Sequence, residues 1–200
     1  MFFSLYNVNA YSTGSYDIDI PSTYEKQNGS DIWQSKSTDK RVTIGIDVFQ
    51  NDNKLNFEDY NEDTIQKDEY IKELEEKFKS NKENITIKSS DVYFTDLNGH
   101  KAIKMDVVTT FNDSNYNSDV YQSQYIVASK NYVYYILISS SDKDSLNSKE
   151  VNTMINSFNI NDEKATKDVS VARYYLSIAL VVTLGIFVFV LTSRKRKHYI

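Results

Sequence analysis

The chain has 200 residues, two histidines, no cysteine and a formal net charge of −5. Without cysteine it has no disulfide, thiolate nucleophile or thiolate zinc site, and two histidines are too few for a histidine-based metal cluster. The charge is unevenly divided: residues 171–200 contain five basic residues and no acidic one, which leaves 18 basic and 28 acidic residues, a net charge of −10, in residues 1–170. Such an acidic region repels phosphate backbones, so we expect no nucleic-acid partner.

The first ten residues form a short apolar run that ends in Val8-Asn9-Ala10. Small residues at the first and third positions of such a triplet are typical of the site that signal peptidase cleaves. We therefore interpret residues 1–10 as the remnant of a signal peptide that lacks its basic start. The alternative is an ordinary N-terminus with a few exposed aromatic residues.

Apolar and polar residues alternate in the first half of the chain, a pattern that predicts strands half-buried in a sheet. The predicted strands cover residues 16–20, 32–37 and 41–49, and Pro21 ends the first of them. Residues 51–63 are polar and acidic and predict a loop. From residue 64 to residue 78 the apolar period becomes helical, which predicts an amphipathic helix that covers the sheet.

The second half predicts more strands and a final helix. Asn98-Gly99 is the strongest short hairpin signal in the chain, and residues 112–119 predict a polar loop. Apolar residues at Val151, Met154, Ile155 and Phe158 have the spacing of one helix face. The predicted strands cover residues 85–88, 92–94, 102–111, 121–128 and 132–139.

Residues 174–192 contain no charged residue, and as a helix they cover about 28 Å, close to the roughly 30 Å hydrocarbon core of a bilayer. We interpret this run as a transmembrane helix that contacts membrane lipid. The residues that follow are a basic cluster and, by the positive-inside rule, place the C-terminus in the cytoplasm and the acidic domain outside. These topology residues are Arg194, Lys195, Arg196 and Lys197.

The sequence is thus expected to divide into five parts. We expect a signal-peptide remnant at 1–10, an extracytoplasmic domain at 11–160, a charged stalk at 161–173, the transmembrane helix at 174–192 and a basic cytoplasmic tail at 193–200. The expected location is the cell membrane, crossed once.

Four stretches carry a resemblance to a known family: YDIDIPSTYE at 16–25, DLNGHKAIK at 96–104, NYVYYILIS at 131–139 and MINSF at 154–158. With the order of strands and helices, they make the domain resemble the PsbP-like family. The resemblance implies an α+β fold in which two or more helices cover an antiparallel β-sheet, to which the sequence adds one C-terminal transmembrane helix. It also implies a binding or assembly role, and it brings no shared catalytic residues.

The best candidate metal site has oxygen-bearing side chains at alternate positions, which can converge on a hard cation such as Ca²⁺. An EF-hand loop, however, has Gly where Ser118 stands and Glu where Gln124 stands, so a solvated hairpin loop is the favoured alternative. The candidate residues are Asp113, Asn115, Asn117 and Asp119.

No catalytic constellation is apparent, because His100 and His198 have no obvious partners. Tyrosines on the predicted strands, such as Tyr121 and Tyr125, form either a binding face or part of the sheet packing, and packing is favoured. We therefore predict a membrane-anchored, non-enzymatic extracytoplasmic domain, without a cofactor, that binds a protein or envelope component. A ligand or calcium sensor that acts through a partner membrane protein is the alternative.

Overall fold

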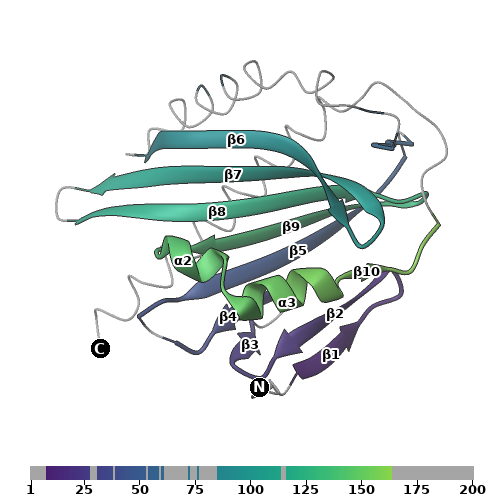
Figure 1. Cartoon of the computed structure of the whole chain (residues 1–200), viewed down its shortest axis with the longest axis horizontal. Coiled ribbons are helices and arrows are strands. Elements are labelled where there is room, and N and C mark those ends of the chain that lie inside the picture. Colours follow the sequence, from purple (N-terminus) through teal and green to yellow (C-terminus); the bar gives the residue numbers. More distant parts are fainter. Residues whose placement is uncertain are drawn as a thin grey trace.

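The computed structural model describes residues 8–27, 31–37, 39–52, 54–58, 60, 72, 76, 85–113 and 116–163, with backbone alone at 85, 89, 111–113, 116 and 117. Within these residues the chain forms two antiparallel sheets and two short helices (Figure 1). Neighbouring strands in both sheets run antiparallel throughout.

The larger sheet has seven strands in the order β3-β4-β5-β9-β8-β7-β6. Alternating side chains divide between its two faces, as the pleat of a strand requires. Both faces are buried near β9, where Tyr134 and Ile136 belong to one face and Val133 and Tyr135 to the other. The strands are β3 (Tyr24–Lys26), β4 (Ile32–Ser35), β5 (Val42–Gln50), β6 (Ile85–Leu97), β7 (His100–Asp113), β8 (Tyr116–Ala128) and β9 (Tyr132–Ser140).

The smaller sheet covers part of one face of the larger sheet, together with helix α3 (Figure 1). It consists of β1 (Val8–Ser12), β2 (Tyr16–Pro21) and β10 (Asn159–Ile160) in the order β1-β2-β10. Helix α3 (Lys149–Ser157) begins after Ser148, whose side chain accepts a hydrogen bond from the backbone N–H of Val151. This is an ordinary N-cap, which satisfies one of the free donors of the first turn.

The main core lies between these layers. Val151, Met154 and Ile155 give α3 one apolar face, and that face is buried with alternate residues of β2, β5 and β9. The members of this core are Tyr16, Ile18, Ile20, Tyr24, Trp33, Val42, Ile44, Ile46, Leu97, Ala102, Val127, Tyr134, Ile136, Ile138, Val151, Met154, Ile155, Phe158 and Ile160.

The Asn98-Gly99 turn joins β6 to β7, as the sequence predicts. Both residues have positive φ angles, 51° at Asn98 and 81° at Gly99, which the two-residue hairpin turn requires and which Asn and Gly tolerate best. The Asn98 side chain also donates hydrogen bonds to the backbone carbonyls of Asn156 and Phe158. The turn is therefore tied to the end of α3.

Two strand predictions need correction. Residues 85–97 form the single strand β6, with a register irregularity between Ile87 and Ser89, where we expected two short strands. Residues 112–119 are not an extended polar loop, because β7 continues to Asp113 and β8 begins at Tyr116. In both places, pairing with a neighbouring strand extends the ladder through polar residues.

The predicted fold class is also wrong. The described residues are mostly antiparallel sheet, and the two helices whose bounds they define are α3 and α2 (Lys143–Leu146), a single turn, so among them the expected covering by two or more helices is not found. Of the helix predicted at 64–78, only Lys72 and Glu76 are described, and both are helical. Hydrogen bonds between antiparallel strands satisfy the backbone N–H and C=O groups in most of the described domain.

The expected fold also included a transmembrane helix. No helix among the described residues is long and apolar enough to cross a bilayer. The run at 174–192 and the basic residues at 194–197 lie outside the described residues. At the other end, Val8, Asn9 and Ala10 lie in β1 and pair with β2, so the predicted cleavage point after Ala10 falls within a strand.

Residues 161–163, which we expected to begin a stalk, contact the turn between β8 and β9. Asp162 accepts hydrogen bonds from the Ser129 hydroxyl at 2.7 Å and from the backbone and side-chain nitrogens of Asn131 at 2.7 and 2.8 Å. Lys130 pairs with Glu163 at 2.6 Å. These contacts are called the Asp162 clamp below, and they hold the end of the described chain against the central strands.

Asp31, just before β4, links the two sheets. Its carboxylate accepts hydrogen bonds from the Tyr11 hydroxyl of β1 at 2.7 Å and the Tyr16 hydroxyl of β2 at 2.9 Å. It also pairs with Lys26 of β3 at 2.8 Å. Burial on its own raises the pKa of Asp31, but the hydrogen bonds from Lys26 and the two tyrosines outweigh it and hold this pKa below its ordinary value.

We expect Asp31→Asn to lower the free energy of unfolding at pH 7 by about 1.5–3 kcal/mol, the usual contribution of hydrogen bonds to a charged group. Because the pKa of Asp31 is lower in the folded state, its stabilisation is present above the unfolded pKa and is lost as the pH falls through the folded pKa. Denaturant unfolding from about pH 6 to pH 2 should therefore show a shallower loss of stability in the variant.

Asp52→Asn, which removes one carboxylate at an exposed position, is the control and should retain the acid profile of the unmodified chain. Identical profiles for the Asp31 variant and the unmodified chain would contradict the role given to Asp31.

Candidate functional site

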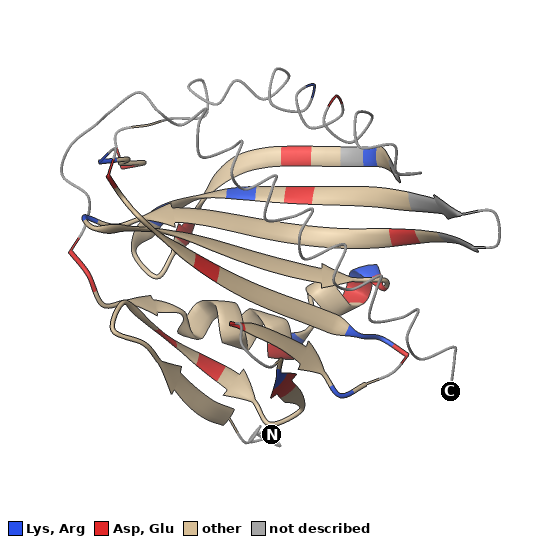
Figure 2. Cartoon of the chain, turned by 180° about the vertical axis from the view of Figure 1, so that it is seen from behind, with Lys and Arg blue, Asp and Glu red and all other residues tan. Residues whose placement is uncertain are grey.

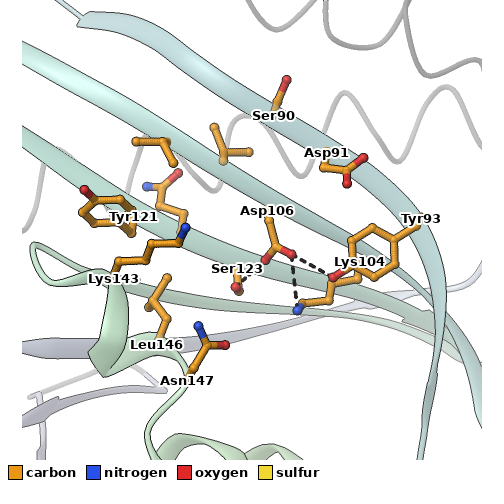
Figure 3. Close-up of a pocket in the computed structure, with 13 residues that line it drawn as sticks. Ser90, Asp91, Tyr93, Lys104, Asp106, Tyr121, Ser123, Lys143, Leu146 and Asn147 are labelled. Atoms are coloured by element: carbon orange, nitrogen blue, oxygen red, sulfur yellow. Dashed lines mark hydrogen bonds and ion pairs between the residues drawn. The ribbon is translucent and has the colours of Figure 1, made fainter.

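An open pocket of about 600 Å³ lies on the part of the larger sheet where β6, β7 and β8 pass beside α2 (Figure 3). It is on the sheet face that α3 and the smaller sheet cover elsewhere, since Lys104 and Asp106 alternate with the opposite-facing Met105. The pocket is lined by Ser90, Asp91, Tyr93, Lys104, Asp106, Val107, Val108, Tyr121, Gln122, Ser123, Lys143, Leu146 and Asn147.

A polar network crosses the floor of the pocket, and Asp106 of β7 is at its centre (Figure 3). The Asp106 carboxylate accepts hydrogen bonds from the Tyr93 hydroxyl at 2.8 Å and from the Ser123 hydroxyl at 2.5 Å. It also pairs with Lys104, whose Nζ lies 3.3 Å away. The residues come from three adjacent strands, so the sheet register fixes their relative positions.

Lys104 is held in its charged form. Its side chain is only 19% exposed, and burial on its own lowers the pKa of an ammonium group. A hydrogen bond with Tyr93 and the negative charge of Asp106 outweigh the burial and raise the pKa of Lys104 above its ordinary range. The Lys104 ammonium also lies 5.5 Å from the ring centres of Tyr93 and Tyr125. Lys104 is therefore a hydrogen-bond donor at neutral pH and not a base.

Gln122 lies on β8 next to the pocket, but its side chain points to the opposite face of the sheet, because Gln122 pairs with Val107 whereas Ser123 pairs with Asp106. Its side chain is 2% exposed, and its Oε1 atom is buried without a hydrogen-bond partner among the described residues. A buried acceptor in this condition has lost its water without a replacement, which costs free energy of about 1–3 kcal/mol.

The arrangement favours binding over catalysis. The Ser123 hydroxyl donates to Asp106, and this carboxylate is already engaged by Lys104 and Tyr93. An activated serine needs an unprotonated base that is free to take its proton, but Lys104 is charged and Asp106 already accepts from Tyr93 and pairs with Lys104. Among the residues that line the pocket there is no histidine.

The candidate cation residues are only partly described. Asp113 and Asn117 lie near the ends of β7 and β8, with the backbone alone described, and Asn115 lies outside the described residues. Asp119 accepts a hydrogen bond from Thr110 at 2.7 Å and pairs with Lys88 at 2.8 Å. Among the described residues no group of three or more acidic or histidine side chains is placed to hold a metal ion. The calcium hypothesis stays a prediction.

The remaining residues singled out from the sequence divide between packing and the pocket. His100 begins β7, away from the pocket lining, and His198 lies outside the described residues. Tyr134 is buried in the main core, as the packing interpretation predicts, whereas Tyr121 lines the pocket.

Sequence reasoning missed the residues at the centre of the site. The available signal was a lysine and an aspartate two residues apart, Lys104 and Asp106, inside a strand whose other face carries the apolar residues Ile103, Met105 and Val107. Residues two apart in a strand share a face, so this pair predicts a polar patch on a sheet.

No family model matches the chain, and neither does any curated protein sequence. Several solved structures are similar to it. Cyanobacterial PsbP (CyanoP) from Synechocystis sp. PCC 6803 has 10% sequence identity and a TM-score of 0.47, with 78% of this chain and 94% of that chain covered. The resemblance to PsbP expected from the sequence is confirmed as a likeness between structures.

Two further similar structures have different described roles. LpqN of Mycobacterium tuberculosis, described as involved in cell envelope biogenesis, has 14% identity and a TM-score of 0.41, with 78% of this chain and 92% of that chain covered. The Ran-binding protein Mog1p of Saccharomyces cerevisiae has 10% identity and a TM-score of 0.38, with 78% and 97% covered. The likeness is one of fold and says nothing of a shared ligand.

We expect Asp106→Asn to lower the pKa of Lys104, because the substitution removes the carboxylate charge that stabilises the ammonium group. Reductive methylation with ¹³C-formaldehyde followed by an NMR pH titration reports this pKa directly.

Asp144→Asn is the matched control, since Asp144 lies on α2 and is exposed outside the pocket lining. It should leave the Lys104 titration unchanged. An unchanged titration in the Asp106 variant would show that the ion pair does not set the charge state of Lys104.

Proposed function

We propose that this chain is a non-enzymatic binding or assembly domain that holds a protein or envelope component in the pocket beside α2. The observation that carries the proposal is the open pocket on the uncovered part of the sheet, with the network of Tyr93, Lys104, Asp106 and Ser123 on its floor. A concave site with a few polar groups in fixed positions is the usual form of a ligand-binding site, so this lining favours a role in binding.

The charge state of the network supports the absence of catalysis. A general base must be neutral or anionic and must contact the proton it removes. Lys104 is protonated, and Asp106 already accepts hydrogen bonds from Tyr93 and Ser123 as well as pairing with Lys104. Their hydrogen bonds and ion pair hold the side chains of the network in fixed positions, with the charged Lys104 as a donor.

We further propose that the domain acts outside the cytoplasm, next to a membrane. The support comes from the sequence: the uncharged apolar run at 174–192 precedes four basic residues at 194–197, and the acidic residues all lie before this run. A location close to lipid restricts the binding partner to components of the membrane or the adjacent envelope.

We expect a photocrosslinking residue in the pocket to capture the bound component in cells. p-Benzoylphenylalanine in place of Tyr121, which lines the pocket, should give an adduct when the full chain is irradiated in its native membranes. Mass spectrometry of the adduct identifies the component and the peptide it joins.

The same photocrosslinking residue in place of Phe49 is the control. Phe49 is also aromatic and exposed, but it lies on the opposite face of the sheet, where its ring meets Tyr135. An adduct at position 121 and none at position 49 supports the pocket as the binding site. Equal adducts at both positions, or none at position 121, would refute it.

A further inference from the structure

We propose that β1 is the place where a partner protein adds an extended strand, and that this strand carries Lys or Arg at alternate positions. The site is a second interaction surface, so it does not depend on the binding proposed for the pocket beside α2. The inference is drawn from three properties of the small sheet: a free strand edge, two carboxylates beside it and the small side chains between them.

The outer edge of β1 is open for pairing. β1 ends the small sheet on one side, and among the described residues no strand lies next to it there (Figure 1). The backbone N–H of Asp19 points away from β1, since it donates to the Ser157 hydroxyl at 2.9 Å. Ala10, which is paired with Asp19, therefore directs its own N–H and C=O to the outer edge. By the same alternation, so do Val8 and Ser12.

The other edges of the two sheets have features that discourage pairing. β3 is three residues long and contains Glu25 and Lys26, and β10 has only two residues. β6 contains charged residues such as Lys88 and Asp91 and has the register irregularity described above. β1 has five residues in regular register, without a proline and without a charged residue (Figure 2). Its edge is thus the best suited of the described edges to accept a strand.

Two carboxylates lie beside this edge, on the face of the small sheet that points away from the main core. Asp17 and Asp19 alternate along β2 with the buried residues Tyr16, Ile18 and Ile20. In the part of the chain that the structure describes, neither carboxylate takes part in an ion pair, and one oxygen of Asp17 is shielded from water without a hydrogen-bond partner. Two like charges on one face repel each other, so this face attracts a positive group.

Small side chains separate the edge from the carboxylates. Ala10 is directly opposite Asp19, and Ser12 is directly opposite Asp17. A residue added beside Ala10 lies two strand spacings, about 9.6 Å, from Asp19. The long side chain of a Lys or Arg at that place crosses the small residue and reaches the carboxylate beyond it. Alternate residues of an added strand share this face, which gives the alternating basic pattern.

A second copy of this chain fits the edge less well than a basic segment does. Its β1 has no cation to offer, and its β2 brings two more carboxylates to the same face. The net charge of −10 over residues 1–170 also favours the approach of a basic segment from another protein. In this mode of binding, main-chain hydrogen bonds supply affinity and the side chains that alternate on one face supply specificity.

Fluorescence polarisation with a labelled peptide tests the inference on the full chain in a non-ionic detergent. The probe is the peptide TKVKVKT, whose lysines lie opposite Val8, Ala10 and Ser12 in an antiparallel arrangement. We expect a dissociation constant of about 10–100 µM. Two comparison peptides, TEVEVET with the opposite charge and TKKKVVT with the same composition but no alternation, should each bind about tenfold more weakly or worse.

Backbone methylation separates strand addition from simple charge attraction. In the antiparallel arrangement, the N–H groups of the peptide's lysines point to β1 and those of its valines point away. N-methylation at the lysines should therefore weaken binding by about tenfold or more, whereas N-methylation at the valines should change it by less than about twofold. Equal effects of the two modifications would contradict strand addition.

Substitutions in the chain place the site. Asp17→Asn combined with Asp19→Asn should weaken binding of TKVKVKT about three- to tenfold, within the usual range for two exposed ion pairs. Asp144→Asn on α2 is the matched control and should bind as the unmodified chain does. Ala10→Pro removes an N–H that the pairing with β2 does not use, so this variant should fold and bind about tenfold more weakly or worse. Ala10→Ser keeps that N–H and should bind normally.

Equal binding of TKVKVKT and TKKKVVT, or no binding of TKVKVKT at about 1 mM, would overturn the inference. So would a dimer of the full chain that Ala10→Pro converts to a monomer, since a second copy would then occupy the edge. If Ala10→Pro lowers the melting temperature, the methylated peptides test the same hydrogen bonds on the unmodified chain. A crosslinked adduct at position 121 reports on the pocket alone, so the two proposals fail separately.

Discussion

The fold depends on one strand that is buried on both faces. From Val133 to Ser140 every residue of β9 is buried, so neither face of the strand reaches water. Its backbone donors and acceptors must therefore be satisfied by strands on both edges, and β5 and β8 supply them along almost the whole length of β9. The rest of the large sheet extends outward from this central strand. The apolar layer of α3 and the small sheet is too narrow to cover all of it, since from β6 and β7 only Leu97 and Ala102 join the main core.

The position of the pocket follows from this incomplete cover. Where the apolar layer ends, side chains on the same sheet face must be compatible with water, and there β7 has Lys104 and Asp106. The single turn α2 forms one wall of the uncovered area without closing it. The network of Tyr93, Lys104, Asp106 and Ser123 satisfies most polar groups internally, which keeps the floor rigid.

Much of the sheet could be predicted from the sequence, because alternation between apolar and polar residues reports burial directly. The strand at 41–49 and the turn at Asn98-Gly99 were both evident in this way. The extension of β7 to residue 113 and the start of β8 at residue 116 could not be predicted in this way, since pairing between polar strand segments depends on the neighbouring strand. The site was missed for a related reason. Lys104 and Asp106 were visible as a polar pair, but their meeting with Tyr93 and Ser123 depends on the register of three strands.

The Asp162 clamp has a mechanical consequence. Any tension applied to the chain beyond residue 163 reaches the clamp first, before it reaches the two-residue strand β10. The load then passes through Ser129 and Asn131 into the turn that leads to β9, which is buried from Val133 to Ser140. The domain can thus be pulled from its C-terminal side without peeling the small sheet from its edge. A pull on the C-terminal side of the domain therefore acts next to the buried central strand β9.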